Sequence, residues 1–444
     1  MIPRTRAPKK EIVGWAMFDF ANQSYTLLII TVVFGDLFTR VIVGDAPDYR
    51  LGNLLWSISV ASSYLLVVLT APVVGAMVDH NGQRKQALFL TYALTIVTTA
   101  ALWFVAPGMI ALGMALVIVS NFAYALGEVL LASFLPSLGP PEDLGRISGF
   151  GWSLGYLGGM VSALFVLFVL GDVTAENFDR IRWVGPWAAV FFLVAALPTF
   201  IFVREPPVAE LPPAPSYLRA GVERVRGTLK HLESYRDLAV LLASIFFAMS
   251  GIAIIVTFAF IYGAQVIQWD ERVRTFMFVV VQVMAAAGAF GFGQLQDRIG
   301  GVRTYRLTLL VWIVAILLIW STPMLVDLLA RAGIFWEAQY VFLVAGSVAG
   351  ICLGGCQSAA RAMVGVLSPL VQTAEMFGFW GLAVRAAGVF GVLAIGLLQV
   401  LVGLQTAVLF CVLLFAIAWV IAATVDEGRG REAAANADRR AGHG

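Results

Sequence analysis

Long runs of apolar residues follow one another through this 444-residue chain and limit it to one class of fold. A helix needs about 20 mainly apolar residues to cross a bilayer, and the chain has roughly twelve such runs. They lie near residues 13–43, 52–78, 87–106, 109–137, 147–170, 185–203, 238–266, 273–296, 307–323, 335–367, 376–402 and 404–425. Hydrophobic residues make up 60% of the chain and charged residues only 13%, too few to cover a soluble fold of this size. We therefore predict an all-α membrane protein with about twelve transmembrane helices.

One charged motif occurs twice, each time in a short break between two apolar runs. The copies read Gly75-x-Met77-x-Asp79-x-x-Gly82-x-Arg84-Lys85 and Gly293-x-Leu295-x-Asp297-Arg298-x-Gly300-Gly301-x-Arg303. They lie about half the chain length apart, which predicts two pseudo-symmetric six-helix halves. We place the N-terminal half at residues 1–203 and the C-terminal half at residues 237–425.

The hydrophilic segment between the halves, residues 204–236, is rich in proline and then basic and amphipathic. It is predicted to be a cytosolic linker with a short surface helix whose basic face meets anionic lipid headgroups. A simple tether without a regulatory role is the alternative. The tail at residues 426–444 is rich in Ala, Arg and Gly, and we expect it to be cytosolic and disordered.

Most of the 29 Lys and Arg residues lie on one side of the membrane if both ends of the chain lie inside the cell. Basic residues collect on the cytosolic side, so this bias predicts cytosolic termini. We expect a multi-pass protein of the plasma membrane, with a bacterial inner membrane favoured. The net charge of +2 reflects this bias, and no nucleic-acid partner is expected.

Several classes of site lack their usual residues. The sequence has no Gly-x-x-x-x-Gly-Lys-Ser/Thr phosphate loop, so no nucleotide is expected. Its three histidines fall in loops or in the tail, where they cannot build a haem or metal site inside the membrane. Cys352 and Cys356 lie one helical turn apart, a pair more typical of small residues packed in a core. We expect a protein that is not an enzyme and that has no cofactor and no metal.

The two charged loops, the twelve spans and the central linker resemble the major facilitator superfamily over the whole chain. Three further segments resemble the branch of that superfamily that contains fungal vacuolar amino-acid effluxers and uncharacterised bacterial members. These segments are residues 15–25 (WAMFDFANQSY), residues 134–138 with 149–159 (FLPSL and GFGWSLGYLGG), and residues 354–361 with 375–381 (GGCQSAAR and EMFGFWG).

In that superfamily each charged loop is thought to latch one half to the other on the cytosolic side while the transporter faces outward. The resemblance implies this role for a set of eight residues: Gly75, Asp79, Gly82, Arg84, Asp297, Arg298, Gly300 and Arg303. Asp79 can meet Arg84 or the positive N-terminus of the eleventh helix, which Gly75 allows to come close. By symmetry, Asp297 with Arg298 or Arg303 would serve the fifth helix. Charges that only set the topology are the alternative.

Charged residues inside apolar runs are candidates for transport chemistry, because each costs about 2.5–3.5 kcal/mol to insert. Asp19, Glu128, Arg361 and Arg385 qualify. Arg385 could hold a carboxylate or phosphate of a substrate, or it could neutralise an acid of another helix. Arg361 is expected to form a structural ion pair with Glu375.

The resemblance implies that helices 1, 4, 7 and 10 line a central cavity, where Asp19 and Glu128 could bind a substrate ammonium or a proton. Glu128 is the first candidate for coupling, because desolvation raises a carboxyl pKa toward neutrality. Asp19 could instead be an acid that stabilises a helix N-terminus. Further polar residues are candidates for substrate contact: Asn22, Tyr25, Tyr124 and Gln357.

The sequence thus predicts a secondary active transporter that moves a small solute by alternating access, with protons or the solute gradient as the driving force. Amino acids are the substrate class that the resemblance implies, and the lipid bilayer is the expected environment. Two alternatives stay open: an exporter of drug-like cations or organic anions, and a membrane sensor or scaffold that binds without transporting.

Overall fold

The computed structural model describes residues 5–45, 49–171, 173–206, 216–230 and 232–441. Helices make up nearly all of these residues, and no strand occurs among them. Twelve helical segments in this part of the chain are long and apolar enough to cross a membrane, as the sequence predicts.

Six of these segments belong to the N-terminal half, with short helices at their ends. In chain order its elements are α1 (Lys9–Tyr25), η1 (Thr26–Val32), α2 (Phe34–Leu37), η2 (Phe38–Val43), α3 (Arg50–Asn81), α4 (Arg84–Ala101), η3 (Leu102–Phe104), α5 (Ile110–Ala132), η4 (Leu135–Ser137), η5 (Pro141–Asp143), α6 (Leu144–Phe165), η6 (Val166–Leu170), α7 (Phe178–Ile181) and α8 (Val184–Phe202). Helix α9 (Tyr217–Lys230) follows within the predicted linker.

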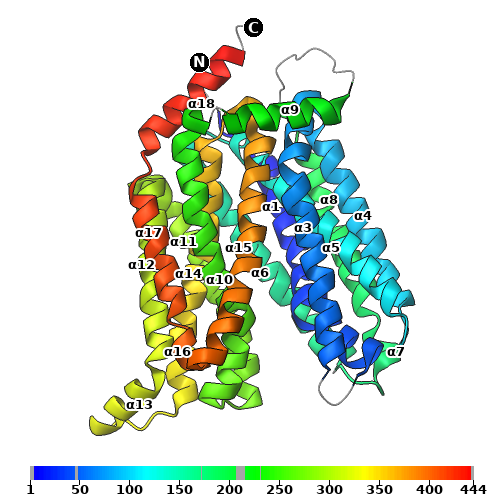
Figure 1. The fold of residues 1–444 in the computed structure, drawn as a ribbon, viewed down its shortest axis with the longest axis vertical. Helices are drawn as coiled ribbons and strands as arrows, with labels where there is room; N and C mark the ends of the chain where they lie inside the picture. Colours follow the sequence, from blue (N-terminus) through cyan, green and yellow to red (C-terminus); the bar gives the residue numbers. More distant parts are fainter. Residues whose placement is uncertain (1–4, 46–48, 172, 207–215, 231, 442–444) are drawn as a thin grey trace. The chain divides into compact units, whose positions relative to one another are not determined.

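The C-terminal half repeats this organisation. Its elements are η7 (Leu232–Tyr235), α10 (Arg236–Tyr262), η8 (Gly263–Ile267), α11 (Glu271–Ile299), α12 (Gly301–Trp320), α13 (Thr322–Arg331), α14 (Ala338–Leu367), η9 (Leu370–Gln372), α15 (Thr373–Val402), α16 (Leu404–Ala407), α17 (Phe410–Ala423) and α18 (Glu427–Ala441). Long helices in each half run side by side and are joined by short breaks (Figure 1).

The chain forms two compact units whose limits differ from the ends of the sequence halves. Unit 1 contains residues 1–140, 154–229 and 370–382. Unit 2 contains residues 141–153, 230–369 and 383–444. The fifth and eleventh spanning helices, α6 and α15, therefore each begin in one unit and end in the other.

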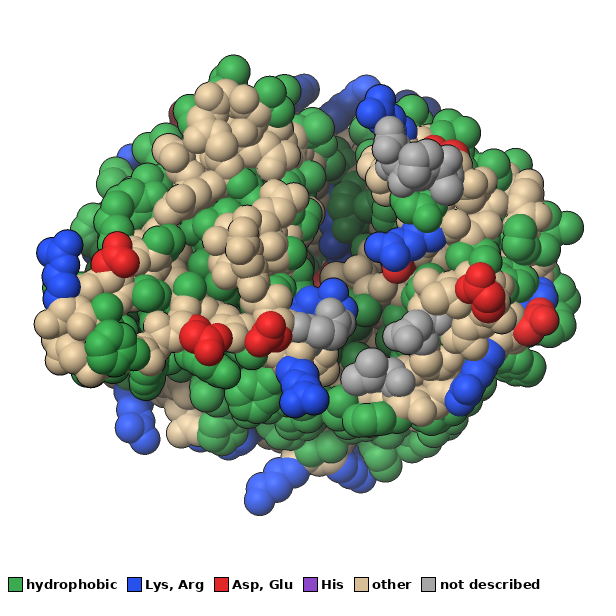
Figure 2. All heavy atoms as spheres, turned by 90° about the horizontal axis from the view of Figure 1, so that it is seen from below, with side chains coloured by type: hydrophobic (Ala, Val, Ile, Leu, Met, Phe, Trp, Pro, Cys, Tyr) green, Lys and Arg blue, Asp and Glu red, His purple; other side chains and the backbone are tan. Residues whose placement is uncertain are grey.

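Many large apolar side chains on the spanning helices are exposed, as the surface of a protein embedded in lipid requires. Leu90, Val97, Leu397 and Val400 are each more than 65% exposed. The end of the molecule in Figure 2, seen from below, carries acidic and basic side chains interspersed with hydrophobic ones.

The first spanning helix changes its hydrogen-bonding pattern partway along. α1 gives way at Thr26 to the π-helical segment η1, and a second π-helical segment, η2, begins at Phe38. The hydroxyl of Thr31 donates to the carbonyl oxygen of Thr26 within η1, over 2.9 Å. π-Helical turns often occur at functional sites.

The C-terminal tail differs from its predicted disorder, because residues Glu427–Ala441 form helix α18. Alanine has the highest helix propensity, and Arg431 pairs with Glu427 one turn earlier, with a 2.5 Å hydrogen bond. Arg429 also donates two 2.7 Å hydrogen bonds to the buried carboxylate of Asp237 at the start of α10. The expectation of disorder was wrong because local helix propensity and this long-range pair outweigh the low hydrophobicity of the tail.

Candidate functional site

The first charged loop joins α3 to α4 and contains a buried ion pair. The chain reverses at Gly82, whose φ of +68° is in the left-handed region that glycine adopts without strain. The turn places the Arg84 guanidinium 2.6 Å from the Asp79 carboxylate. The Arg84 side chain is 4% exposed and the Asp79 side chain is fully buried, so solvent screens the pair little.

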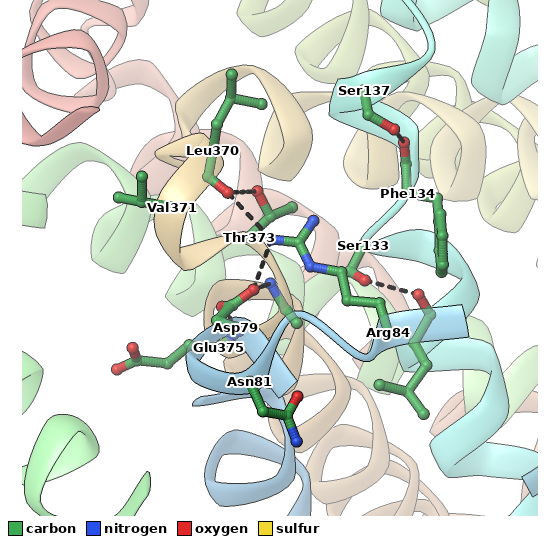
Figure 3. Close-up of polar contacts among 12 residues, drawn as sticks. Asp79, Asn81, Arg84, Ser133, Phe134, Ser137, Leu370, Val371, Thr373 and Glu375 are labelled. Carbon is green, nitrogen blue, oxygen red and sulfur yellow. Dashed lines mark hydrogen bonds and ion pairs between the residues drawn. The ribbon is translucent and has the colours of Figure 1, made fainter. Parts of the chain in front are cut away.

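The same carboxylate stabilises the start of α15. Asp79 accepts hydrogen bonds from the backbone N–H groups of Ala374 at 3.1 Å and Glu375 at 2.8 Å (Figure 3). An anion at a helix N-terminus satisfies free N–H groups and interacts favourably with the helix dipole. Arg84 adds a 3.1 Å hydrogen bond to the carbonyl oxygen of Leu370, just before this helix. Both partners predicted for Asp79, Arg84 and the eleventh helix, are confirmed.

Gly75 lies where α3 approaches the start of α15 most closely. A Cβ atom added there would be 2.1 Å from the carbonyl oxygen of Ala374, far inside van der Waals contact. The close approach of the two helices therefore requires glycine at this position, as predicted.

Glu375 in the first turn of α15 is held by the linker helix α9. Its carboxylate lies 3.1 Å from the Arg224 guanidinium and accepts a 2.5 Å hydrogen bond from the Thr228 hydroxyl. Arg224 also donates to the carbonyl oxygen of Val371 at 2.5 Å. The Glu375 side chain is fully buried, so α9 supplies the positive charge that this carboxylate needs.

Glu205 follows α8 and stabilises the start of α4. Its two carboxylate oxygens accept 2.8 Å hydrogen bonds from the backbone N–H groups of Arg84 and Lys85. Burial raises the pKa of Glu205 above its ordinary value, and the bonds from Lys85 and Arg84 oppose that shift. The first charged loop is thus fixed by two carboxylates, Asp79 and Glu205.

The second charged loop joins α11 to α12 in unit 2 and is less deeply buried. Asp297 accepts hydrogen bonds from the backbone N–H of Arg146 in the first turn of α6, with oxygens at 3.2 and 3.3 Å. The Arg146 side chain lies 3.6 Å from the same carboxylate, is 43% exposed, and also pairs with Asp143. Gly300, with a φ of +94°, ends α11.

The contact of Asp297 with the fifth spanning helix is as predicted, but its basic partner is different. The sequence suggested Arg298 or Arg303, whereas the structure pairs Asp297 with Arg146. Arg146 reaches Asp297 because α6 begins beside this loop.

Glu427 stabilises the start of α12 in unit 2. One carboxylate oxygen accepts hydrogen bonds from the backbone N–H groups of Gly301 at 2.9 Å and Val302 at 3.3 Å. Its other oxygen accepts from Arg431, which also reaches Glu142 at 3.0 Å.

Arg361 is buried in α14 and is held by α6 within unit 2. Its guanidinium donates to the hydroxyl and the carbonyl oxygen of Ser148, each at 3.1 Å, and lies over the ring of Trp152. Glu375 is held by Arg224 and Thr228. Glu375 belongs to unit 1 and Arg361 to unit 2, so their ion pair stays a prediction.

Tyr25 and Tyr124, both predicted site residues, are brought together by α1 and α5. Their rings stack with centroids 4.6 Å apart. The Tyr25 hydroxyl lies 2.8 Å from that of Ser120, and the Tyr124 hydroxyl lies 2.6 Å from that of Thr26. The second contact involves the first residue of the π-helical segment η1.

Asp19 and Asn22 precede Tyr25 on α1, and both side chains are buried. Asn22 is 2% exposed. In the part of the chain that the structure describes, its side-chain oxygen Oδ1 accepts no hydrogen bond. A buried acceptor without a donor carries a free-energy cost that a bound ligand can remove.

The remaining candidates are half-buried. Glu128 lies one turn beyond Tyr124 on α5, in unit 1. Gln357 on α14 and Arg385 on α15 belong to unit 2.

Four residues that position the loops were not predicted from the sequence: Arg146, Glu205, Arg224 and Glu427. A sequence signal existed for the two glutamates, since each directly follows the sixth span of its half. Arg224 lay in a segment recognised only as basic and amphipathic.

Comparison with known proteins identifies the family. The sequence profile described as "Vacuole effluxer Atg22 like" matches residues 54–144 and 141–435. The chain belongs to the vacuole effluxer Atg22-like family. This family assignment agrees with the resemblance seen in the motifs around Gln357 and Glu375, which lie within the matched residues.

Two relatives and one solved structure are similar to this Atg22-like chain over most of its length. An uncharacterised MFS-type transporter of Bacillus subtilis is 23% identical, over 94% of this chain and 95% of that protein. Autophagy-related protein 22 of Pyricularia oryzae is 22% identical, over 87% of this chain and 72% of that protein. The fucose:proton symporter of E. coli has the same fold, with a TM-score of 0.71 at 13% identity, over 94% of this chain and 98% of that one.

The Atg22-like chain is therefore a multi-pass membrane protein with the major facilitator fold, in which twelve helices form two pseudo-symmetric halves. This confirms the fold and the superfamily branch predicted from the sequence.

Proposed function

We propose that this protein is a secondary active transporter that carries a small solute, amino acids first, by alternating access and in exchange for or together with protons. Membership of a family named for a vacuole effluxer supports transport as the general activity. The buried polar residues of α1 and α5 support a site for a polar solute.

The observation that carries the proposal is the buried oxygen of Asn22. It lies in a spanning helix beside Asp19, three residues before Tyr25, and without a hydrogen-bond donor among the described residues. The ammonium group of an amino acid is a donor that would satisfy it. Polar and ionisable groups inside a membrane are costly and mark substrate and ion pathways.

Glu128 is the proposed proton carrier. It lies on α5 one turn from Tyr124, whose hydroxyl contacts Thr26 at the start of η1. A carboxyl group in a spanning helix can take up and release a proton as its surroundings change. Gln357 and Arg385 of unit 2 are also proposed as substrate residues, and the arginine is suited to a carboxylate.

The two charged loops are proposed to stabilise one of the states between which the transporter alternates. Asp79 with Arg84, and Asp297 with Arg146, each fix the first turn of another spanning helix, α15 or α6. Breaking such contacts would release these helix ends.

Proton flux in liposomes tests the proposal. The purified protein is reconstituted with a trapped pH-sensitive dye and challenged with pools of amino acids, then with organic anions and drug-like cations. We expect flux with an amino-acid pool and its loss in Glu128→Gln. Glu176→Gln is the matched control, since Glu176 is exposed in the loop before α7.

The other outcomes separate the alternatives. Flux only with organic anions or cations would replace amino acids as the substrate class. Exchange of labelled amino acids without proton flux, unchanged in Glu128→Gln, would remove proton coupling. Binding of solute without any exchange would support the non-transporting sensor.

We also propose that the protein lies in a bacterial inner membrane with both termini and α9 in the cytosol, as the distribution of basic residues indicates. The three native cysteines are buried, so an impermeant maleimide would label introduced cysteines selectively. In intact cells we expect labelling of Glu176→Cys and none of Glu223→Cys on α9. The reverse pattern would invert the topology.

A further inference from the structure

One face of helix α9 packs against α3 within unit 1. A Cβ atom added at Gly221 would lie 2.7 Å from the Cγ atom of Met77 and 3.0 Å from the carbonyl oxygen of Val73, so α9 rests directly on the end of α3. One and two turns later, Arg224 and Thr228 bind Glu375. Because these positions recur at helical spacing, they define a single docked face.

A second face of α9 is apolar and exposed. Residues 218, 222, 225 and 229 lie along one stripe of the helix, and all four are Leu or Val. The Leu218 side chain is 60% exposed and that of Leu229 is 54% exposed. Contact of this apolar stripe with water is unfavourable, so we expect the stripe to face an apolar environment.

A third face, on the other side of this stripe, is basic. Arg219, Arg226 and Lys230 are exposed there, and Glu223 is the acidic residue among them. Arg219 forms an ion pair with Glu223 over 2.9 Å, with the arginine side chain 82% exposed. Three basic residues against one acidic residue leave this face positively charged.

The orientation of α9 within unit 1 suits a membrane surface. The helix lies crosswise at the end of α3, whereas the spanning helices run lengthwise (Figure 1). A helix in this position has an apolar stripe beside a basic stripe, which is the pattern of helices that lie in the headgroup region of a bilayer.

We propose that α9 binds anionic phospholipid headgroups, with Arg219, Arg226 and Lys230 as the headgroup site and Leu218 and Leu229 inserted at the acyl boundary. The charge of the basic face fits an acidic lipid surface, and the apolar stripe fits a bilayer better than it fits a soluble anion.

This binding stabilises α9 in its docked position. Because the opposite face holds the buried carboxylate of Glu375, the lipid charge acts on the first turn of α15 through one rigid helix. The composition of the surrounding leaflet thereby regulates how firmly this helix end is held. The inference is independent of the solute and of proton coupling.

An environment-sensitive fluorophore on α9 tests the proposal in the full-length protein. The fluorophore is attached at Leu229→Cys, where the buried native cysteines do not compete. The labelled protein is placed in nanodiscs of phosphatidylcholine alone or of phosphatidylcholine with one-third phosphatidylglycerol. We expect blue-shifted emission and stronger quenching by brominated acyl chains in the anionic discs.

Charge removal identifies the headgroup site. In Arg219→Gln/Arg226→Gln we expect the response to phosphatidylglycerol to weaken, by about fivefold in the bound-to-free ratio of α9 for each basic residue removed. Arg439→Gln/Arg440→Gln on α18 removes the same charge from exposed positions and should leave the response unchanged. High salt should weaken the response to phosphatidylglycerol in the protein that keeps all three basic residues.

Three results would overturn the proposal. One is the same emission in neutral and anionic discs. Another is a full response that persists in Arg219→Gln/Arg226→Gln. The third is an equal response to inorganic phosphate added to neutral discs, which would show a site for soluble anions instead of a lipid surface.

Discussion

Glu205 and Glu427 occupy equivalent places in the two halves of the chain. Each lies within four residues after the sixth span of its half, and each accepts two backbone N–H groups at the start of the third span. The bonds are 2.8 and 2.8 Å for Glu205, and 2.9 and 3.3 Å for Glu427. The two halves therefore share a link between their third and sixth spans as well as the repeated charged loop.

This equivalence predicts that Glu205→Ala and Glu427→Ala destabilise the protein to a similar degree, by about 1 kcal/mol each, because each change removes a carboxylate from a helix N-terminus. The measurement is the thermal unfolding midpoint in detergent, followed by tryptophan fluorescence. Glu176→Ala is the control and should leave the midpoint unchanged. A midpoint that falls in only one of the two variants would show that the links are not equivalent in energy.

The two charged loops should differ in strength. Arg84→Gln leaves Asp79 buried without its ion-pair partner, and we expect a loss of about 3 kcal/mol or more. Arg146→Gln removes a side chain that is 43% exposed, so its loss should stay near 0–1 kcal/mol. Unfolding midpoints of the two variants check the order. Equal losses would mean that burial does not set the strength of these pairs.

The start of α15 should be coupled to α9. In a double-mutant cycle, Arg224→Gln and Glu375→Gln should show an interaction energy of about 0.5–3 kcal/mol, because the two side chains are in contact. Additivity of these two changes would contradict the contact. The same cycle with Arg361→Gln and Glu375→Gln measures the pair that the sequence predicts.

Gly75→Ala should destabilise the protein by about 1–3 kcal/mol, since the new methyl group would overlap the carbonyl oxygen of Ala374. Gly396→Ala in α15 is the matched control. In the described residues no atom lies within 4 Å of the Cβ position there, and alanine favours a helix. The unfolding midpoint should fall in the first variant and hold or rise in the second. A fall of equal size in both would indicate a general intolerance of alanine.

Asn22→Ala separates a ligand contact from a structural one. The side-chain oxygen has no donor among the described residues, so its removal should not lower the unfolding midpoint. Loss of one hydrogen bond to the solute should raise the KM for transport by about tenfold. A lower unfolding midpoint with an unchanged KM would show that Asn22 stabilises the fold and does not bind the solute.

The sequence predicted the elements of this fold well because length and apolarity alone determine a spanning helix in lipid. It predicted the contacts of Asp79 because Arg84 is local and the helix N-terminus followed from the family resemblance. It failed for Asp297, whose partner Arg146 lies 151 residues away. Such partners depend on tertiary contacts that a single sequence does not specify.

Residues 141–153 of the N-terminal half belong to unit 2, and residues 370–382 of the C-terminal half belong to unit 1. Each half of the sequence therefore supplies a helix start to the other unit. A polypeptide with only the first six spans would lack the start of α15, and the carboxylate of Asp79 would have lost the amide groups that it binds. One with only the last six would lack the start of α6, which Asp297 holds. Either half expressed alone would therefore have to obtain these helix starts from a second polypeptide.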